Sequence, residues 1–375
     1  VWRAATLPWL AAALPRRTLL VVAAALWSLY VVGRVLDRLG LEALAYPAEL
    51  GGAAWMGVLF LLFAGLVVAD LITGFGLLLP ASAPALRTAG LGAGMLLSAI
   101  ALFQGMRPPV ITSYEMPLAG LPASLDGTVL VQLSDLHLGT LLGEKWLARV
   151  IAQVAGERPD IVVITGDLVD GDTRHAERLL PRLKTLQAPL GVWAVTGNHE
   201  FYAGLDRSIR LLEQAGFRVL RDQAVAVAPG LVLAGVDDLT ARRQFGDRDQ
   251  HAIECALSDR PPGATVLLSH TPWQATTAAT LGVSLMLSGH THEGQIWPFS
   301  YLVRLTYPFL GGAYAVGDMT LVVSRATGTW GPRMRLWRPA EIVKIVLRAG
   351  SAHRPAGLAA SAPGTPILGF LPLGR

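Results

Sequence analysis

The chain opens with apolar stretches that carry almost no charge. Uncharged runs cover residues 18–33, 50–69 and 88–106. A helix of ~17–25 apolar residues crosses a bilayer, and the second and third runs fall in that range. The first run is slightly short, but Arg17 and Arg34 at its ends can extend their charges to the membrane surface. We therefore predict a membrane anchor of about three helices over residues 1–106.

Beyond residue 106 the pattern changes to short apolar runs that alternate with helical patterns. Runs typical of strands cover residues 128–133, 160–165 and 190–196, and helical patterns follow at 144–155, 175–186 and 205–215. Strands that are apolar on both faces are typical of parallel βαβ units. Later strands are predicted at residues 231–236, 265–269 and 283–288, and antiparallel strands at 313–323 and 334–346.

These elements predict an α/β domain over residues 124–348, with two sheets face to face and helices outside. A linker is expected at 107–123. Residues 349–375 are rich in Ala, Pro and Gly, which predicts a disordered tail.

Composition adds few constraints. The net charge is +4, and the basic residues are mostly arginine without a basic run interleaved with aromatics, so nucleic-acid binding is not predicted. The single cysteine, Cys255, excludes an internal disulfide.

Small polar clusters follow five of the predicted strands. They are SDLHLG with Asp135 and His137, TGDLVDG with Asp167, TGNHE with Asn198 and His199, LSHTP with His270, and LSGHTH with His290 and His292. The first three clusters are spaced by about one βαβ unit, ~30 residues. Such spacing places them at the carboxyl edge of one sheet, where open α/β sheets hold ligands.

The residue types in these clusters are metal ligands. Asp, His and Asn suit Mn, Fe or Zn, and they are too many for one open site. Two ions ~3.5–4 Å apart can hold a shared hydroxide and clamp an in-line phosphoryl displacement. Asp167, in the middle cluster, is the natural bridge. A lone Asp after a strand is more often a helix cap, but five of the eight histidines lie at strand ends, which favours metal binding.

The ordered series SDLHLG, GDLVDG, GNHE, SH and GHTH resembles the calcineurin-like metallophosphoesterase superfamily over about residues 124–347. The approach LPASLDGTVLVQLSDLHLG and the Gln of GHTHEGQ resemble its bacterial membrane-associated branch, which includes hydrolases of the pyrophosphate in UDP-diacylglucosamine. Glu293 stands where that branch usually has Gly, a departure that bears on substrate identity and not on metal chemistry.

The resemblance implies a four-layer α/β/β/α sandwich and a role for each polar residue. Asp135, His137 and His292 would hold one ion. Asn198, His270 and His290 would hold the other, with Asp167 as the bridge. His199 would face the scissile phosphate, where it stabilises charge or protonates the leaving group. Mn is the ion expected to support activity best in vitro.

The resulting expectation is a membrane-anchored dimetal phosphoesterase that hydrolyses a phosphodiester or pyrophosphate by attack of the bridging hydroxide. A metal-loaded but inactive membrane sensor or scaffold is the alternative, and a transporter ranks below it. Asp170 and Asp172 are expected to form turns. Asp237 and Asp238 could contact substrate or a metal ligand, and Glu200 could orient His199.

An aromatic stretch, IWPFSYLVRLTYPFLGGAY, follows the last cluster. It either caps the core or forms an apolar lid toward the bilayer, with Trp297 and Phe299 contacting a lipid-linked phosphate ester. Arginines before the first span favour a cytoplasmic N-terminus in a bacterial cell membrane. Three spans then place the catalytic domain outside the cytoplasm. The natural substrate and the oligomeric state stay open.

Overall fold

The structure is a computed structural model that describes residues 7–246 and 251–350, and it divides into two compact units. One unit contains the N-terminal helices up to Arg107 together with two later segments, Ile296–Pro298 and Gly331–Arg338. The other unit holds the rest of the described chain. We call them the helical unit and the catalytic unit.

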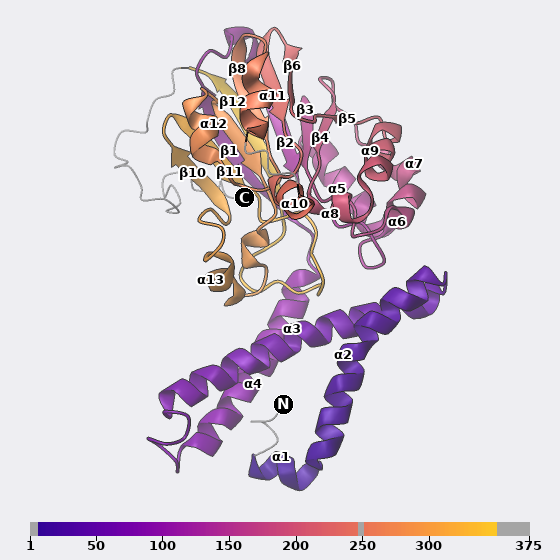
Figure 1. Cartoon of the computed structure of the whole chain (residues 1–375), viewed down its shortest axis with the longest axis vertical. Coiled ribbons are helices and arrows are strands. Elements are labelled where there is room, and N and C mark those ends of the chain that lie inside the picture. The colour runs from indigo at the N-terminus through magenta and orange to yellow at the C-terminus, as the bar shows by residue number, and fades with distance from the viewer. Residues whose placement is uncertain (1–6, 247–250, 351–375) are drawn as a thin grey trace. The chain divides into compact units, whose positions relative to one another are not determined.

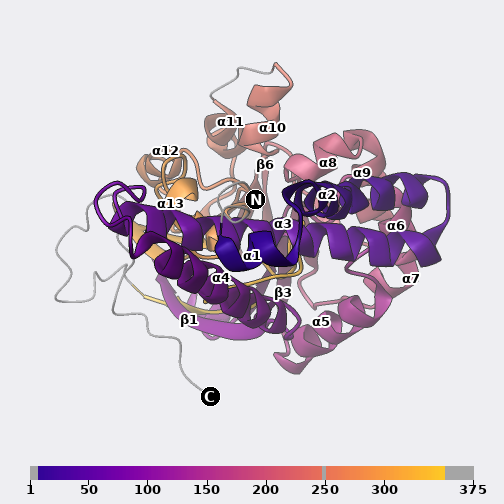
Figure 2. The same ribbon diagram turned by 90° about the horizontal axis from the view of Figure 1, so that it is seen from below.

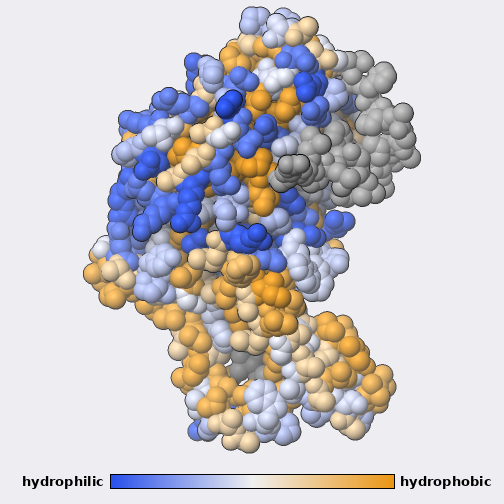
Figure 3. Space-filling model, turned by 180° about the vertical axis from the view of Figure 1, so that it is seen from behind, coloured by the Kyte–Doolittle hydropathy of each residue, from blue (hydrophilic) through white to orange (hydrophobic). Residues whose placement is uncertain are grey.

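The helical unit begins with a short helix and continues with three long ones. These are α1 (Pro8–Ala13), α2 (Arg16–Arg38), α3 (Glu42–Ile72) and α4 (Ala83–Gly105). By length and composition, the last three are apolar enough to cross a membrane. Figure 3 shows hydrophobic residues over most of the visible surface of these helices. The three predicted spans are therefore present as helices.

Small residues bring α3 close to both of its neighbours, along which it runs in Figure 2. A Cβ added to Gly65 would lie 2.2 Å from the carbonyl oxygen of Gly90, so the backbones of α3 and α4 touch there. Close backbone approach of this kind is typical of helices that pack in membranes. Two ion pairs link these helices, Arg34 with Glu49 at 3.2 Å and Arg87 with Asp70 at 2.7 Å.

The two later segments complete a small apolar core with α3 and α4. Ile296, Met334 and Leu336 pack with Leu61 and Ala101. The backbone N–H of Arg335 donates to the carbonyl of Ala101 at 2.9 Å. The sequence prediction of a strand from residue 334 is therefore wrong for its first part, because residues 331–338 pack on helices instead.

The catalytic unit contains two six-stranded sheets (Figure 1). The first runs in the order β1 (Val110–Leu118), β12 (Glu341–Ala349), β2 (Val129–Leu133), β3 (Ile161–Thr165), β4 (Val192–Val195) and β5 (Arg218–Val219). The second runs in the order β10 (Gly312–Val316), β11 (Met319–Val323), β9 (Leu285–Ser288), β8 (Gly263–Leu268), β7 (Gly230–Gly235) and β6 (Gln223–Ala228).

Two strand predictions need correction. The expected linker at 107–123 contains β1, which pairs in parallel with β12. β12 is antiparallel to β2 but parallel to β1, so the end of the domain is not purely antiparallel. The predicted tail begins inside β12, whose last residue is Ala349, and its residues from 351 on lie outside the described ones.

Helices cover both outer faces. On one side lie α5 (Glu144–Gly156), α6 (Thr173–Arg178), α7 (Leu180–Leu183) and α9 (Leu205–Gln214), and on the other α11 (Ala252–Ser258) and α12 (Ala275–Thr280) (Figure 1). Short helices near the strand ends are η2 (Ala123–Leu125), α8 (Asn198–Tyr202), α10 (Leu239–Gln244), η3 (His292–Gly294) and α13 (Phe299–Val303). The helix predicted at 175–186 is split into α6 and α7, since Pro181 lacks the N–H that a continuous helix needs.

Successive side chains of each strand point alternately to the helices outside and to the space between the two sheets, which gives the domain its layers. In β3, Val162 and Ile164 face the α5–α9 side, whereas Ile161 and Val163 point between the sheets. In β8, Leu267 packs on the α11–α12 side. Because successive side chains of a strand point to opposite faces, each sheet buries both of its faces. The predicted four-layer α/β/β/α sandwich is confirmed.

Candidate metal centre

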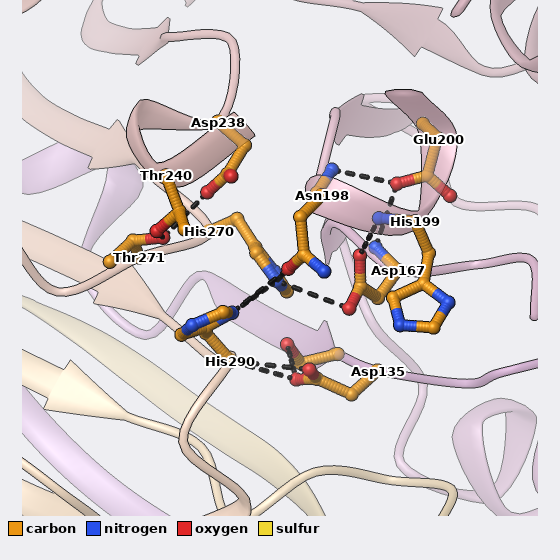
Figure 4. A network of polar contacts seen from close by, with 12 residues as sticks. Asp135, Asp167, Asn198, His199, Glu200, Asp238, Thr240, His270, Thr271 and His290 are labelled. Carbon is orange, nitrogen blue, oxygen red and sulfur yellow. Dashed lines mark hydrogen bonds and ion pairs between the residues drawn. The ribbon is translucent and has the colours of Figure 1, made fainter. Parts of the chain in front are cut away.

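The predicted polar residues meet at the carboxyl ends of parallel strands. Strands β2, β3 and β4 are parallel in one sheet, and β8 and β9 are parallel in the other. The segments that follow these strands carry all the predicted ligands and His199. Figure 4 shows Asp135, Asp167, Asn198, His270 and His290 pointing toward one another. All of these side chains except His290 are at least nine-tenths buried.

Three ligand atoms form a first cluster. The Nε2 atom of His292 lies 3.2 Å from Oδ1 of Asp135 and 3.2 Å from Nε2 of His137. Asp135 and His137 follow β2 in the first sheet, whereas His292 follows β9 in the second, so tertiary packing brings His292 to the other two. This is the set predicted for one ion.

A second cluster lies beside the first. Oδ1 of Asn198 is 3.2 Å from Nε2 of His270 and 3.0 Å from Nδ1 of His290. The two histidine nitrogens are 3.2 Å apart. This is the set predicted for the other ion.

A single oxygen of Asp167 faces both clusters. Its Oδ2 lies 3.8 Å from Nε2 of His137 in the first cluster and 3.3 Å from Nε2 of His270 in the second. Its other oxygen accepts the backbone N–H of His199 at 2.8 Å. Asp167 is thus fixed between the clusters, in the place of a bridging ligand.

These separations fit divalent ions. Metal–ligand bonds of ~2.0–2.2 Å place neighbouring ligand atoms about 2.8–3.6 Å apart. Imidazole nitrogens whose lone pairs face each other at 3.2 Å, as in His137 and His292, repel unless a proton or a cation lies between them. The predicted ligands therefore have the spacing and the chemistry that a pair of divalent metal ions requires.

The pKa shifts of Asp167 and His290 are in the sense that metal binding requires, whereas that of His270 is not. Burial would lower the pKa of His270, but Asp167 outweighs burial and holds it well above the usual range. Burial would raise the pKa of Asp167, but His270 and His199 outweigh it and hold that pKa well below its usual range. Burial also lowers the pKa of His290 to about 3, helped by His270, so His290 is a neutral imidazole. The carboxylates are ionised and this histidine offers a lone pair, as metal binding requires.

Three of the four predicted histidine ligands, His270, His290 and His292, have a hydrogen-bond partner at the nitrogen that points away from the clusters. Nδ1 of His270 meets the carbonyl of Thr165 at 2.8 Å, and Nδ1 of His292 meets Oε1 of Gln295 at 3.1 Å. His290 Nε2 lies 2.8 Å from the Tyr307 hydroxyl. Such partners fix the tautomer and ring orientation of metal-binding histidines. Among the described residues, the Nδ1 atom of His137 is buried without a hydrogen bond, and the nearest carboxylate oxygen, Oδ1 of Asp170, is 3.7 Å away.

The backbone is strained at this site. Five of the seven predicted ligands have a positive φ, between 46° and 69°, namely Asp135, His137, Asp167, His290 and His292. Non-glycine residues rarely adopt this region, and such strain clusters at functional sites. A neighbouring glycine permits close approach: a Cβ on Gly197 would lie 2.2 Å from Oδ1 of Asp167.

His199 lies beside the first cluster, and one of its ring nitrogens lies within 4.8 Å of ligand atoms of both His137 and Asp167, close enough to hold an ion with them. Its ring is edge-on to that of His137, with centroids 4.6 Å apart, and its Nδ1 is 3.6 Å from Oδ1 of Asp170. The sequence interpretation of Asp170 as a turn former missed this position between two histidines. Asp172 behaves as predicted, since it caps α6 by accepting the N–H of Arg174.

Three further acidic residues act on the surroundings of the site. Glu200 does not orient the ring of His199; its carboxylate accepts four backbone N–H groups, those of Gly197, Asp167, Leu168 and Val169. Burial raises the pKa of Glu200 to about 7, and the N–H donors of Gly197 and Asp167 act in the opposite sense. Asp237 accepts from Thr196 and Arg221, and Asp238 accepts from Thr271 and Ala241.

Aromatic side chains near the site were only partly foreseen. Tyr202 and Trp330 are about half exposed, with rings 5.4 and 6.5 Å from that of His199, and the sequence analysis did not single them out. Phe299 is 43% exposed at the start of α13. Trp297 belongs to the helical unit, where its ring lies 5.0 Å from that of Trp337.

Comparison with known proteins places this site in a family. Residues 128–294 match the family model described as calcineurin-like phosphoesterase. An uncharacterized metallophosphoesterase of Aquifex aeolicus is 35% identical over 240 residues, which cover 64% of this chain and 91% of that protein. The chain therefore belongs to the calcineurin-like metallophosphoesterase family.

Other relatives extend the comparison. A transmembrane protein with metallophosphoesterase domain from Danio rerio is 36% identical over 263 residues, or 67% of this chain, and the match spans about 60% of that relative's length. A calcineurin-like phosphoesterase structure from Bacillus subtilis covers 53% of this chain and 81% of its own at 14% identity, with a TM-score of 0.35. Animal and bacterial relatives both match, so the narrower bacterial membrane branch stays a prediction.

Proposed function

We propose that the chain is a membrane-anchored phosphoesterase that uses two divalent ions, one in each ligand cluster, to hydrolyse a phosphodiester or pyrophosphate. The observation that carries the proposal is the single Asp167 oxygen that faces both clusters. When bound, two ions supply Lewis acidity that lowers the pKa of water and neutralises charge on phosphoryl oxygens. An inactive sensor would have no need of His199 beside an intact ligand set.

The protein's own residues supply positioning and proton transfer. Asp167 is held by Glu200 through its backbone N–H and itself holds the backbone of His199. The His199 ring, next to the first cluster and to Asp170, can donate a proton to the departing oxygen or stabilise its charge. The buried site excludes bulk water, which strengthens each of these electrostatic interactions.

Hydrolysis of bis(p-nitrophenyl) phosphate by the full chain in detergent tests the proposal. We expect EDTA to abolish the activity and added Mn²⁺ to restore it best among Mn²⁺, Zn²⁺ and Mg²⁺. A protein that binds Mn²⁺ but hydrolyses neither this diester nor a pyrophosphate would favour the sensor or scaffold role.

A lipid-linked phosphate ester is the substrate class that the surroundings of the site suit best. The segment between Gln295 and Tyr307 starts and ends at side chains that contact His292 and His290. Between these ends it exposes apolar side chains, with Leu302 at 55% and Leu305 at 84%. Exposed apolar groups next to a polar centre fit a substrate with acyl chains and a phosphate head group. A chain with three apolar helices would share a membrane with such a substrate.

The substrate class is tested with Phe299→Ser and Leu302→Ser combined, since both side chains are exposed and their loss should not disturb the core. Activity on a lipid-linked pyrophosphate should fall at least tenfold while activity on the soluble diester persists. Val110→Ser, an exposed apolar change on β1, is the matched control. Equal loss on both substrates would assign the segment to the stability of the site, and unchanged lipid hydrolysis would remove the lipid proposal.

The orientation proposal follows from charge. Arg16 and Arg17 are the first two residues of α2, the first of the three apolar helices, and positive charge favours the cytoplasmic side. Three spans would then place the catalytic unit outside the cytoplasm. A reporter fused after Arg348 that is active only in the cytoplasm would overturn this orientation.

A further inference from the structure

The ring of His290 is held from the side opposite to the second cluster. Its Nδ1 faces Asn198 and His270, and its Nε2 lies 2.8 Å from the hydroxyl of Tyr307. The Tyr307 ring is stacked on Trp273, with centroids 5.6 Å apart and planes 19° apart. Tyr307 is therefore fixed by its ring and can act on His290 through its hydroxyl.

Three further side chains continue from Tyr307 into the core. Burial raises the pKa of Tyr307, and an interaction of its hydroxyl with the Thr240 side chain lowers it. Thr240 is hydrogen-bonded to Thr271 at 2.8 Å, and the Thr271 hydroxyl donates to Oδ2 of Asp238 at 2.5 Å. Asp238 and Thr271 have no exposed surface. Figure 4 shows Asp238, Thr240 and Thr271 beside His270 and His290.

Once Nδ1 of His290 binds an ion, the donor and the acceptor of each contact between His290 and Asp238 are determined. Nδ1 must then offer its lone pair, so Nε2 carries the proton and donates to the Tyr307 oxygen. Tyr307 in turn donates to Thr240, and Thr240 donates to Thr271, because the Thr271 proton is already given to Asp238. Each hydroxyl accepts one hydrogen bond and donates one, and the carboxylate only accepts.

We propose that Asp238, Thr271, Thr240 and Tyr307 form a relay of hydrogen bonds that positions His290 for the second ion. It takes the place of the carboxylate that commonly holds a metal-binding histidine directly. The inference rests on the proposed assignment of His290 to the second ion. These four are positioning residues, since none of them lies in either ligand cluster. Asp238 thus reaches a metal ligand only through three hydroxyl groups.

The test measures metal binding to the full chain in detergent, stripped of metal and equilibrated against a series of free Mn²⁺ concentrations. Tyr307→Phe keeps the ring on Trp273 and removes the hydroxyl. We expect one ion to bind as in the wild type and the other to bind ~10–100-fold more weakly. At saturating Mn²⁺, kcat should return toward the wild-type value, because the ligands themselves are intact.

Two further variants separate the relay from a general loss of packing. Tyr314→Phe is the matched control, since that hydroxyl meets only backbone groups of Leu310 and Gly311. Thr240→Val breaks the relay at the residue after Tyr307. The double variant Thr240→Val, Tyr307→Phe should bind Mn²⁺ no more weakly than Tyr307→Phe alone, because both substitutions interrupt the same series of hydrogen bonds.

The outcomes are distinct. Wild-type affinity for both ions in Tyr307→Phe, or an equal loss in Tyr314→Phe, would overturn the relay and leave the two-ion site standing. Binding of only one ion by the wild type would overturn the two-ion assignment itself, and the relay with it.

Discussion

Replacing Glu200 by Gln should destabilise the catalytic unit more than its conservative chemistry suggests. One carboxylate oxygen of Glu200 accepts the N–H groups of Gly197 and Asp167 at 2.7 and 2.9 Å. The other accepts those of Leu168 and Val169 at 2.9 and 3.3 Å. In either orientation, the amide NH₂ of Gln would face two N–H donors that have no other acceptor.

The magnitude follows from these contacts. Hydrogen bonds to a charged group contribute about 1.5–3 kcal/mol each, so the loss of two costs about 3–6 kcal/mol. At a slope of ~3 kcal/mol/M, the urea midpoint should fall by ~1–2 M. The assay is urea unfolding of the full chain in detergent, followed by circular dichroism at a pH well above 7, because burial raises the pKa of Glu200 to about 7 and the carboxylate must be charged.

Glu177→Gln provides the comparison, because that carboxylate is exposed and pairs with Arg207 at the surface. We expect it to change stability by no more than ~1 kcal/mol. If Glu200→Gln shifts the midpoint by less than ~0.3 M, the carboxylate does not organise the loop after β3, and its four donors are satisfied in another way.

Two further substitutions test the site. Asp167→Asn should lower turnover more than the loss of any terminal ligand, because both ions lose the shared oxygen; wild-type turnover in this variant would remove Asp167 as the bridge. Gly289→Ala should weaken the first ion, because its Cβ would lie 1.9 Å from Oγ of Ser134 and 2.4 Å from Oδ2 of Asp135. Gly156→Ala at the end of α5, where nothing lies within 4 Å, should leave metal content unchanged, and equal metal content in both variants would contradict the close approach at Gly289.

Much of the fold could be predicted because a strand that is buried on both faces is a continuous run of apolar residues in the sequence. The strands around residues 128–133 and 160–165 are apolar on both faces, and the structure buries both faces of each. The polar residues that follow these strands could be grouped because parallel strands end at one edge. β1 was missed although Thr112, Tyr114, Met116 and Leu118 alternate, since Pro117 interrupts the pattern that marks a strand.

The parts that could not be predicted depend on tertiary contacts without a local pattern. Glu200 binds backbone N–H groups, which every sequence has, so no residue marks its partners. The relay from Asp238 to His290 joins residues up to 69 positions apart, and only the packed structure brings their hydroxyls together. The segment 331–338 packs on α3 and α4, and its alternation of apolar and arginine residues predicted a strand instead.

The most direct test of the two-ion mechanism is the metal content and turnover of His199→Ala, measured on one Mn²⁺-loaded preparation of the full chain beside the wild type. His199 lies next to the first cluster, and we propose that it acts on the phosphate and is not a metal ligand. We predict two ions per chain in both proteins and a turnover ~10²–10⁴-fold lower in the variant. Loss of an ion from His199→Ala, or two bound ions with wild-type turnover, would contradict the account.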